Sequence, residues 1–409
     1  MRRLTQARCE VCIVGDGAIA KTAALGFARA GRSVTLLCPP ATAVSAALDS
    51  AAADALEPSW DVRVYALNHT AHDLLSSLKV WDALDGARVA PVDAMAIFGD
   101  GAGAGGLAFD AYGAHVGALA WIVEDRNVTM ALDGALRFAH NVTIVRARAT
   151  KLEFDELGAT VRLEGGDSIF ADLVVGADGA QSWVRGQCDI GLDYRSYGQR
   201  GVVSNFACEL PHHGVAHQWF AGVDGIVALL PLPGQRVSLV WSAPDALADA
   251  LRRMSPLELA ARVSVFCCEK LGALTPLLPE LVKDFPLLLM RPHAVTAARV
   301  ALIGDAAHVV HPMAGHGMNL GFADVVALLD IVARCEPQRA IGDERVLARY
   351  ARARKEDVLL MQIATDGLAR LFGSDIEPLR AVRNFGLNLL DKFPLVKHRL
   401  IGHALGKQH

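Results

Sequence analysis

Short apolar runs that end in glycine recur along the chain, and the first of them opens a βαβ pattern. Residues 11–14 (VCIV) have the composition of a buried strand, and residues 15–17 (GDG) that of a tight turn. Residues 18–30 are rich in alanine with few helix breakers, and residues 33–37 (SVTLL) form a second strand pattern. Because strand, turn, helix and strand follow each other closely, we expect two parallel strands joined by a crossover helix.

The same combination of strand and glycine turn occurs twice more. Residues 172–176 (DLVVG) precede the turn at 177–179 (ADG), and residues 300–303 (VALI) precede Gly304-Asp305. Residues 317–334 then continue as a largely apolar helix. Since these units are scattered along the chain, we expect them to assemble into one discontinuous nucleotide-binding domain.

The stretch from residue 196 to residue 242 alternates apolar and polar positions between Pro/Gly turns, which predicts antiparallel strands. These strands are residues 202–208, 217–220, 226–230 and 237–241. Two later helical patterns cover residues 343–372 and 377–405.

These patterns predict an α/β fold, with a discontinuous Rossmann-like domain, an inserted β-rich domain and C-terminal helices. The expected division is residues 1–70, 100–180 and 290–340 for the nucleotide-binding domain, 71–99 and 181–289 for the substrate domain, and 341–409 for the C-terminal helical region.

Composition narrows the class of protein. The 409 residues are 52% hydrophobic and carry a net charge of −4, so a large core is expected and a nucleic-acid partner is not. No apolar run reaches the length of a membrane-spanning helix, and we expect a cytoplasmic protein. Cys9 and Cys12 are spaced as a CxxC pair, but both lead into the first strand, where burial is the favoured interpretation over metal or redox chemistry.

Gly15-x-Gly17-x-x-Ala20 is a dinucleotide-binding fingerprint. The first glycine permits the tight turn, the second lets a pyrophosphate approach the backbone, and the third position must be small so that helix and strand pack closely. The N-terminus of the following helix supplies free N–H groups and the positive end of a dipole. The spacing and the position after a strand therefore predict a cofactor with a pyrophosphate.

Cys38 occupies the end of the second strand, where an acidic residue normally binds the ribose hydroxyls. A thiol is a poor acceptor, so we expect either weak binding of the ribose or another group in that role. By this reasoning, Cys38→Glu is expected to tighten the binding of the cofactor.

Two further motifs follow the second and third strand units. Residues 176–185 read GADGAQSWVR, residues 304–308 read GDAAH, and residues 311–321 read HPMAGHGMNLG. Asp305 follows a strand directly, so it can accept hydrogen bonds from a sugar-type hydroxyl. The Pro-x-x-Gly-x-Gly stretch opens a helix whose N–H groups can face the edge of a flavin that becomes negatively charged on reduction. The alternative is that Asp178 or Asp305 only forms the turn in its glycine loop.

In this order, the three motifs resemble those of the FAD-dependent aromatic-ring hydroxylases built like para-hydroxybenzoate hydroxylase. Further stretches make the chain similar to the UbiH/UbiF/VisC group of ubiquinone-biosynthesis hydroxylases, over nearly its whole length. These stretches are residues 61–67 (DVRVYAL), 121–124 (WIVE), 216–220 (AHQWF), 228–232 (ALLPL), 240–242 (VWS) and Tyr350-x-x-Ala353-Arg354.

The resemblance implies FAD as cofactor, NAD(P)H as co-substrate and a role for each motif. It implies that Gly15, Gly17 and Ala20 cradle the pyrophosphate, with Arg63 reaching it. Asp178 and Gly179 would serve both FAD and the nicotinamide coenzyme. The remaining residues would bind the ribityl chain or the pyrophosphate, as for Asp305, or line the isoalloxazine. They are Gly304, Asp305, Pro312, Gly315, His316, Gly317, Met318 and Asn319.

The chain departs from the family pattern at three positions. Cys38 replaces the usual Glu, Ala20 the usual Gly, and His316 the Gln that is usual in the group. No catalytic base can be named, so the flavin-edge loop with Pro312, Gly315, His316 and Gly317 is the candidate reaction centre. The histidines at 308, 311 and 316 span a Pro-Gly loop, so their spacing does not imply a metal site.

The implied activity is hydroxylation of a polyprenylated phenol or benzoquinol by oxygen transfer from a flavin C4a-hydroperoxide. Two alternatives remain open: a hydroxylase of a small soluble phenol, and a flavin-binding scaffold in a biosynthetic complex. Residues 380–409 carry six Lys or Arg residues against one acid, interspersed with apolar residues. This basic amphipathic pattern suits either a surface that contacts a membrane or a partner, or helices packed on the protein's own core.

Overall fold

The computed structural model describes residues 7–40, 60–99, 106–277, 282–310 and 316–372. Its first large sheet has the strand order β18-β19-β11-β1-β2-β8, and β10 and β9 extend it beside β11. These strands are β1 (Ala7–Val14), β2 (Val34–Cys38), β8 (Val142–Arg146), β9 (Ala149–Phe154), β10 (Ala159–Leu163), β11 (Ser168–Gly176), β18 (Thr296–Ala297) and β19 (Val300–Leu302).

The centre of this sheet is parallel and confirms the expected βαβ unit. Strand β1 lies between β2 and β11, with Val11 opposite Val34 and Leu173. Val11, Cys12 and Ile13 are completely buried, which explains why the strand reads as an unbroken apolar run. Cys9 and Cys12 are both buried within β1, as expected.

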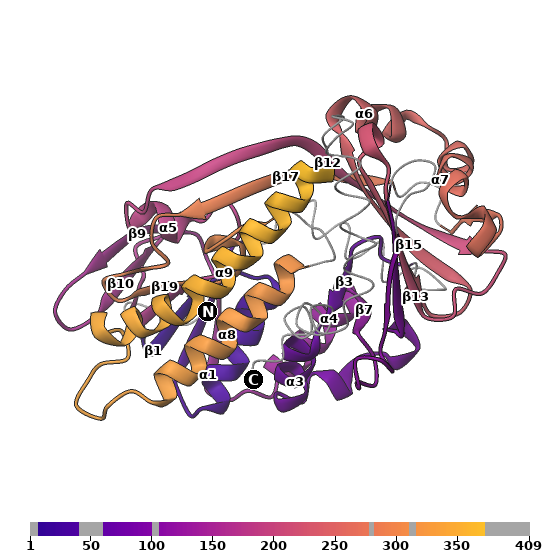
Figure 1. The fold of residues 1–409 in the computed structure, drawn as a ribbon. Helices are drawn as coiled ribbons and strands as arrows, with labels where there is room; N and C mark the ends of the chain where they lie inside the picture. The colour runs from indigo at the N-terminus through magenta and orange to yellow at the C-terminus, as the bar shows by residue number, and fades with distance from the viewer. Residues whose placement is uncertain (1–6, 41–59, 100–105, 278–281, 311–315, 373–409) are drawn as a thin grey trace.

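Helices cover one face of the first sheet, and α8 and α9 run side by side in front of it (Figure 1). The main cluster of buried residues joins this face to α1, α3, α4 and α8, while the other face packs with residues of β9, β10 and α5. The helices are α1 (Ala18–Arg29), α3 (His69–Ser77), α4 (Asp125–Leu136), α5 (Trp183–Gln187), α8 (His316–Ala333) and α9 (Glu344–Phe372).

A second large sheet has the order β16-β12-β15-β14-β13-β5-β6, with β17 also paired to β12. Strands β12 and β17 form a long antiparallel pair that connects the two parts of the molecule (Figure 1). The strands are β5 (Ala94–Phe98), β6 (Gly106–Asp110), β12 (Leu192–Cys208), β13 (Val215–Phe220), β14 (Ile226–Leu232), β15 (Arg236–Pro244), β16 (Leu274–Pro276) and β17 (Lys283–Pro292).

The four antiparallel strands expected between residues 196 and 242 are present as β12, β13, β14 and β15. Helices α6 (Asp245–Arg253) and α7 (Pro256–Leu271) pack on one face of this sheet around the buried Trp241. Helix α7 begins with a capping box, in which Ser255 and Glu258 bond reciprocally to each other's backbone, and Pro256 follows at the first helical position.

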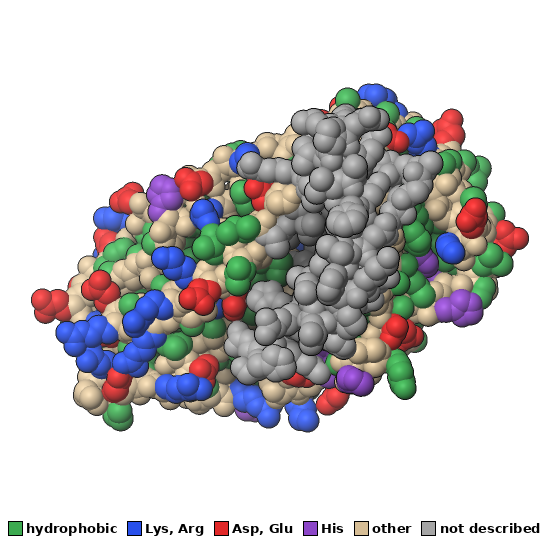
Figure 2. Space-filling view, viewed as in Figure 1, with side chains coloured by type: hydrophobic (Ala, Val, Ile, Leu, Met, Phe, Trp, Pro, Cys, Tyr) green, Lys and Arg blue, Asp and Glu red, His purple; other side chains and the backbone are tan. Residues whose placement is uncertain are grey.

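A small sheet with the order β3-β7-β4 lies between the two large ones and packs with the second sheet's other face. Its strands are β3 (Val64–Leu67), β4 (Val89–Val92) and β7 (Ala120–Glu124). No helix in the described ranges combines the length and apolar character needed to cross a membrane. Figure 2 shows basic and acidic side chains mixed over the part of the surface built around α8 and α9.

The packing shifts two boundaries of the expected division. Helix α3, expected in the substrate domain, buries Leu74 and Leu75 in the same cluster as α1 and α8. Strand β6, expected in the nucleotide-binding domain, pairs with its neighbour β5 in the second sheet. Both shifts follow from tertiary partners that local patterns do not reveal. The helix expected at 377–405 lies outside the described residues.

Candidate functional site

The first glycine turn is held against the second motif. Gly15 has a φ of +142°, and a Cβ there would lie 2.3 Å from the Ala177 carbonyl oxygen. The Ala177 N–H donates to the Val14 carbonyl at 2.9 Å, and the Gly15 N–H donates to the Leu37 carbonyl at 3.0 Å. Only glycine satisfies both the backbone conformation and this close approach. The structure therefore brings the first and second motifs together, as the sequence predicts.

Gly17 leaves open space at the start of α1. It is the N-cap of that helix, no side chain caps its first turn, and a Cβ at this position would meet nothing within 4 Å. Free N–H groups, the positive end of the helix dipole and an unfilled approach suit a phosphate. Ala20 is fully buried one turn later and packs close to Gly15. This cradle fits the pyrophosphate of a dinucleotide such as FAD.

An acidic group is present at the end of β2, although it does not come from β2. The Cys38 Sγ lies 3.3 Å from the Asp16 Oδ1. Burial, together with the neighbouring Asp16 carboxylate, raises the pKa of the Cys38 thiol to about 12, so the thiol is the donor. Lys21 and Arg146 each approach the Asp16 carboxylate to 3.7 Å. Sequence reasoning missed Asp16, whose position within the fingerprint was the available signal.

Arg63 and Asp305 approach each other from different parts of the chain. Arg63 directly precedes β3, and Asp305 lies in the 3₁₀ turn Gly304–Ala306 that follows β19. The Asp305 side chain reaches solvent, yet the surrounding protein removes part of its hydration and so raises the pKa of its carboxyl group. The nearby charges of His308 and Arg63 act in the opposite direction and lower that pKa. Arg63 also lies 3.9 Å from Asp125. The pair places a cation and an accessible carboxylate beside the glycine turns.

Asp178 is occupied by its own loop. Its Oδ1 accepts from the Ser182 hydroxyl at 2.5 Å, and its Oδ2 accepts from the Val184 N–H at 3.0 Å. Ser182 is the N-cap of α5, so Asp178 stabilises the start of that helix. Gly179 has a φ of +81° and open space around it. Arg185 then donates to the Ala180 and Ala306 carbonyls, which ties the second motif to the third.

A buried ion-pair network fixes the third motif, and its central residue was missed in the sequence. Asp324 accepts from the Gly304 N–H at 2.8 Å, from the His308 Nε2 at 2.7 Å and from the Arg354 Nε at 2.7 Å. Burial alone would raise the pKa of Asp324, but His308 and Arg354 hold it below the ordinary value. The Tyr350-x-x-Ala353-Arg354 stretch was the sequence signal for this network.

The start of α8 is tied to β3 through Asn319. Its Oδ1 accepts from the Asn68 N–H at 3.0 Å, and its Nδ2 donates to the Ala66 carbonyl at 2.8 Å. Gly317 and Met318 are half-buried beside it, and Met318 packs on the main core. His316 opens the helix, whereas Pro312 and Gly315 of the candidate flavin-edge loop lie outside the described residues.

The second sheet turns two unpaired polar groups toward the small sheet. Asn205 on β12 and Ser238 on β15 are directly opposite each other and almost fully buried. The Asn205 Nδ2 donates to the Asp61 carbonyl, two residues before Arg63. Within the described part of the chain, the Asn205 Oδ1 and the Ser238 Oγ have no partner. A buried polar group without a partner is costly, which makes this face a candidate for binding a polar ring substituent.

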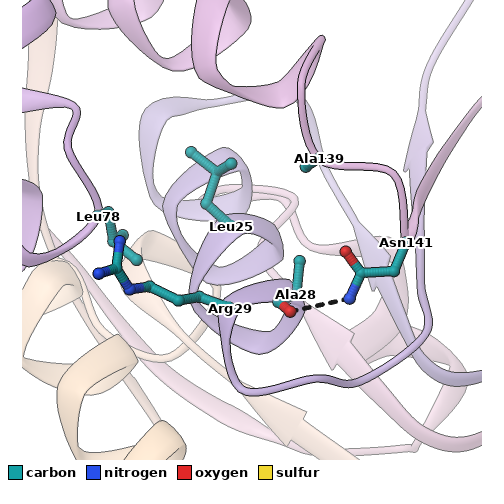
Figure 3. A pocket seen from close by; sticks show the side chains of 6 residues that line it. All are labelled: Leu25, Ala28, Arg29, Leu78, Ala139 and Asn141. Atoms are coloured by element: carbon teal, nitrogen blue, oxygen red, sulfur yellow. Dashed lines mark hydrogen bonds between the residues drawn. The ribbon is translucent and has the colours of Figure 1, made fainter.

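A small surface pocket lies away from these motifs, at the C-terminal end of α1 (Figure 3). There Asn141 donates from its Nδ2 to the Ala28 carbonyl at 2.8 Å and to the Arg32 carbonyl at 2.7 Å, which caps the helix. The lining residues are Leu25, Ala28, Arg29, Leu78, Ala139 and Asn141. Because the fingerprint is at the opposite end of α1, this pocket is separate from the candidate site.

Comparison with known proteins agrees with this geometry. The FAD binding domain family matches residues 127–361, more than half of the chain. The 3-demethoxyubiquinol 3-hydroxylase of Escherichia coli (strain K12) is 34% identical, covering 98% of this chain and 100% of the relative. The ubiquinone hydroxylase UbiL of Rhodospirillum rubrum is 32% identical over 97% of this chain and 89% of its own length.

Solved structures share the fold at lower sequence identity. The p-nitrophenol 4-monooxygenase PnpA of Pseudomonas putida DLL-E4 superposes with a TM-score of 0.74 at 20% identity, covering 98% of this chain and all of the other. The FAD-dependent monooxygenase fold is thereby confirmed. The chain belongs to the FAD-binding-domain family, within the group of ubiquinone-biosynthesis hydroxylases, and is an FAD-dependent monooxygenase.

Proposed function

We propose that this chain hydroxylates the ring of a polyprenylated phenol or benzoquinol on the route to ubiquinone. The observation that carries the proposal is the match of 34% identity to a 3-demethoxyubiquinol 3-hydroxylase across the full length of both chains. One oxygen atom of O₂ enters the ring and the other leaves as water, while NAD(P)H supplies two electrons. When bound, FAD supplies this redox chemistry, and the chain binds, orients and shields the reactants.

The motif residues divide this work between them. We propose that Gly15, Gly17 and Ala20 hold the FAD pyrophosphate at the start of α1, with Arg63 reaching toward its charge. Asp305 accepts hydrogen bonds from the ribityl hydroxyls. The open space at Gly17 and the exposed Asp305 carboxylate support these roles.

Other motif residues act by holding the site in shape. Asp178 orders the second loop for FAD and the nicotinamide coenzyme, while Gly179 leaves room for their approach. Gly304 fixes the turn that presents Asp305. We keep Pro312, Gly315, Gly317, Met318 and Asn319 as the proposed flavin-edge residues. The contacts of Asn319 to β3 support the placement of Met318 at the start of α8.

We assign the substrate to the second sheet's face that carries Asn205 and Ser238. Their unpaired Oδ1 and Oγ are enclosed between the sheets, so a ring hydroxyl or methoxyl would bond them only where the small sheet moves to admit the ring, which would then be oriented for oxygen transfer. Apolar neighbours on the same side, including Met95, Phe109 and Leu230, suit a hydrocarbon chain.

The test is product analysis with purified holoenzyme. NAD(P)H oxidation stimulated by a prenylated phenol, with one atom of ¹⁸O₂ in the product, supports the proposal. Turnover on simple phenols alone would replace it with the small-substrate alternative. Flavin binding without any substrate-stimulated oxidation would favour the scaffold alternative.

We also propose that residues 380–409, which lie outside the described residues, contact an anionic membrane. This segment contains one acid, Asp391, and six basic residues, namely Arg380, Arg383, Lys392, Lys397, Arg399 and Lys407. Changing three of these cations to Gln should weaken binding to vesicles containing anionic lipid and leave binding to neutral vesicles unchanged. Equal binding of the variant and the parent to the anionic vesicles would contradict the proposal.

A further inference from the structure

At the proposed adenosine end of the FAD site, the acid lies in the turn after β1 and a hydrogen-bond donor lies at the end of β2, where the acid is usual. In dinucleotide-binding folds, an acidic residue at the end of the second strand accepts the ribose hydroxyls. Here β2 ends in Cys38, which is 1% exposed and cannot reach solvent. Its Sγ is directed at the Asp16 carboxylate, 3.3 Å away, in the turn between β1 and α1. The Asp16 carboxylate thus lies one hydrogen bond away from position 38, where the fold normally has its acidic residue.

The Asp16 carboxylate is held in place yet remains accessible. Lys21 lies 3.7 Å from its Oδ1, and Lys21 is itself fixed by a 2.8 Å ion pair to Asp133. Arg146, the register partner of Cys38 on β8, lies 3.7 Å from the Oδ2. The Asp16 side chain is still 35% exposed, so lone pairs remain for a ligand. The two cations fix the position of the carboxylate, and a carboxylate is a strong acceptor for a ribose hydroxyl.

We propose that Asp16 replaces the missing strand-end acid and binds the adenosine ribose hydroxyls of FAD, with Cys38 acting as a positioning residue that donates its S–H to the carboxylate. The proposal rests on the FAD dependence of the family and not on the assigned substrate. It reverses the expectation from the sequence for Cys38→Glu. A glutamate at this position would meet Asp16 at close range, and two adjacent carboxylates repel each other.

The experiment measures the dissociation constants of FAD and FMN with deflavinated protein, by quenching of flavin fluorescence. We expect Asp16→Asn to weaken FAD binding about ten- to hundred-fold, as for a lost charge-assisted hydrogen bond. FMN binding should be unchanged, because FMN has no adenosine. The matched control is Asp330→Asn, which removes an exposed carboxylate paired with Arg334 on α8 and should leave FAD binding within about twofold.

Moving the charge back to β2 is the sharper test. Cys38→Glu alone should weaken FAD binding, whereas the double variant Asp16→Asn/Cys38→Glu should recover most of the parent affinity. A double variant that binds FAD no better than either single variant would overturn the proposal, as would an Asp16→Asn variant that loses FMN affinity equally.

A ligand analogue keeps the proposal testable if a variant does not fold. FAD that lacks the adenosine 2′- and 3′-hydroxyls should bind the unaltered protein at least tenfold more weakly than FAD does. Equal affinity for both compounds would overturn the assignment of Asp16. Because every readout is cofactor binding, an incorrect substrate would leave these results unchanged.

Discussion

The two ends of the proposed FAD site are built from the same local pattern and use it differently. Both consist of a buried strand, a Gly-Asp turn and a helix. At the β1–α1 turn, no side chain caps the helix and the Asp16 carboxylate is partly exposed. At the β19–α8 turn, the Gly304 N–H is donated to Asp324, which is fully buried with His308 and Arg354. The β1–α1 turn keeps its polar groups available for a ligand, whereas the turn after β19 is held by hydrogen bonds to buried side chains of the protein.

This difference shows that a shared motif does not assign a shared role to its acids. Asp16 and Asp305 remain accessible, whereas Asp178 and Asp324 bond within the protein. The internally bonded acids hold the loops rigid, and a rigid loop presents the accessible acids in a fixed geometry. Substitutions should therefore separate into those that lower stability and those that lower FAD affinity.

The largest expected effect is on stability, from Asp324→Ala. The variant leaves the buried Arg354 and His308 without their shared acceptor, which should cost about 3–5 kcal/mol. Thermal and denaturant unfolding of the apoprotein measure it. The control is Asp330→Ala on the same helix, whose exposed pair with Arg334 should contribute less than about 0.5 kcal/mol. Equal effects of the two changes would contradict a special role for the network.

The pH dependence of that effect has a defined sign. Because the pKa of Asp324 is lowered in the folded state, its contribution is fully present above the unfolded value of about 4 and is lost as the pH falls through the folded value. The stability gap between the parent and Asp324→Ala should therefore stay constant from pH 8 to pH 5 and narrow only below about pH 4. A gap that already narrows between pH 8 and pH 5 would contradict this role for the Asp324 carboxylate.

Gly15→Ala should lower stability by roughly 3 kcal/mol, since it combines a left-handed backbone conformation with a clash against the Ala177 carbonyl. The loss should appear as a lower melting temperature both with and without FAD. A variant with the melting temperature of the parent would show that the loop relaxes away from the second motif.

Asp305→Ala should give folded protein with little flavin, because its exposed carboxylate makes no hydrogen bond to the residues that the structure describes. Loss of one charge-assisted hydrogen bond corresponds to about 1.5–3 kcal/mol of FAD binding. The ratio of flavin to protein absorbance, followed by titration of the apoprotein, measures it. Full occupancy with unchanged affinity would remove Asp305 from the site.

Gly17→Ala should have the smallest effect on stability and should act mainly on FAD binding. The backbone at Gly17 has a φ of −79° and its surroundings are open, so alanine costs only about 1 kcal/mol as a helix cap. Its methyl group would occupy the space assigned to the pyrophosphate, and we expect about tenfold weaker FAD binding. If Gly17→Ala binds FAD as tightly as the parent, the pyrophosphate lies elsewhere.

The sequence by itself determined the local units of this protein. Alternation and apolar runs located β12 to β15 and the β1–α1–β2 unit, because strand and helix periodicities are written into neighbouring residues. The fingerprint located Gly15 at a position where the structure accepts only glycine. The order of the three motifs was sufficient to indicate the family.

Tertiary structure alone decided which groups are free to bind a ligand. Asp16 meets Cys38 across 22 positions of sequence, and Asp324 meets Arg354 across 30, so no local pattern could tell the accessible acid from the buried one. The same limit explains why the sequence did not assign α3 and β6 to the right part of the molecule. Helix α3 packs in the main core cluster, and β6 pairs with β5, and both partners are set by the tertiary structure. A side chain's chemical role depends on its neighbours in space, and folding brings those neighbours together from distant parts of the chain.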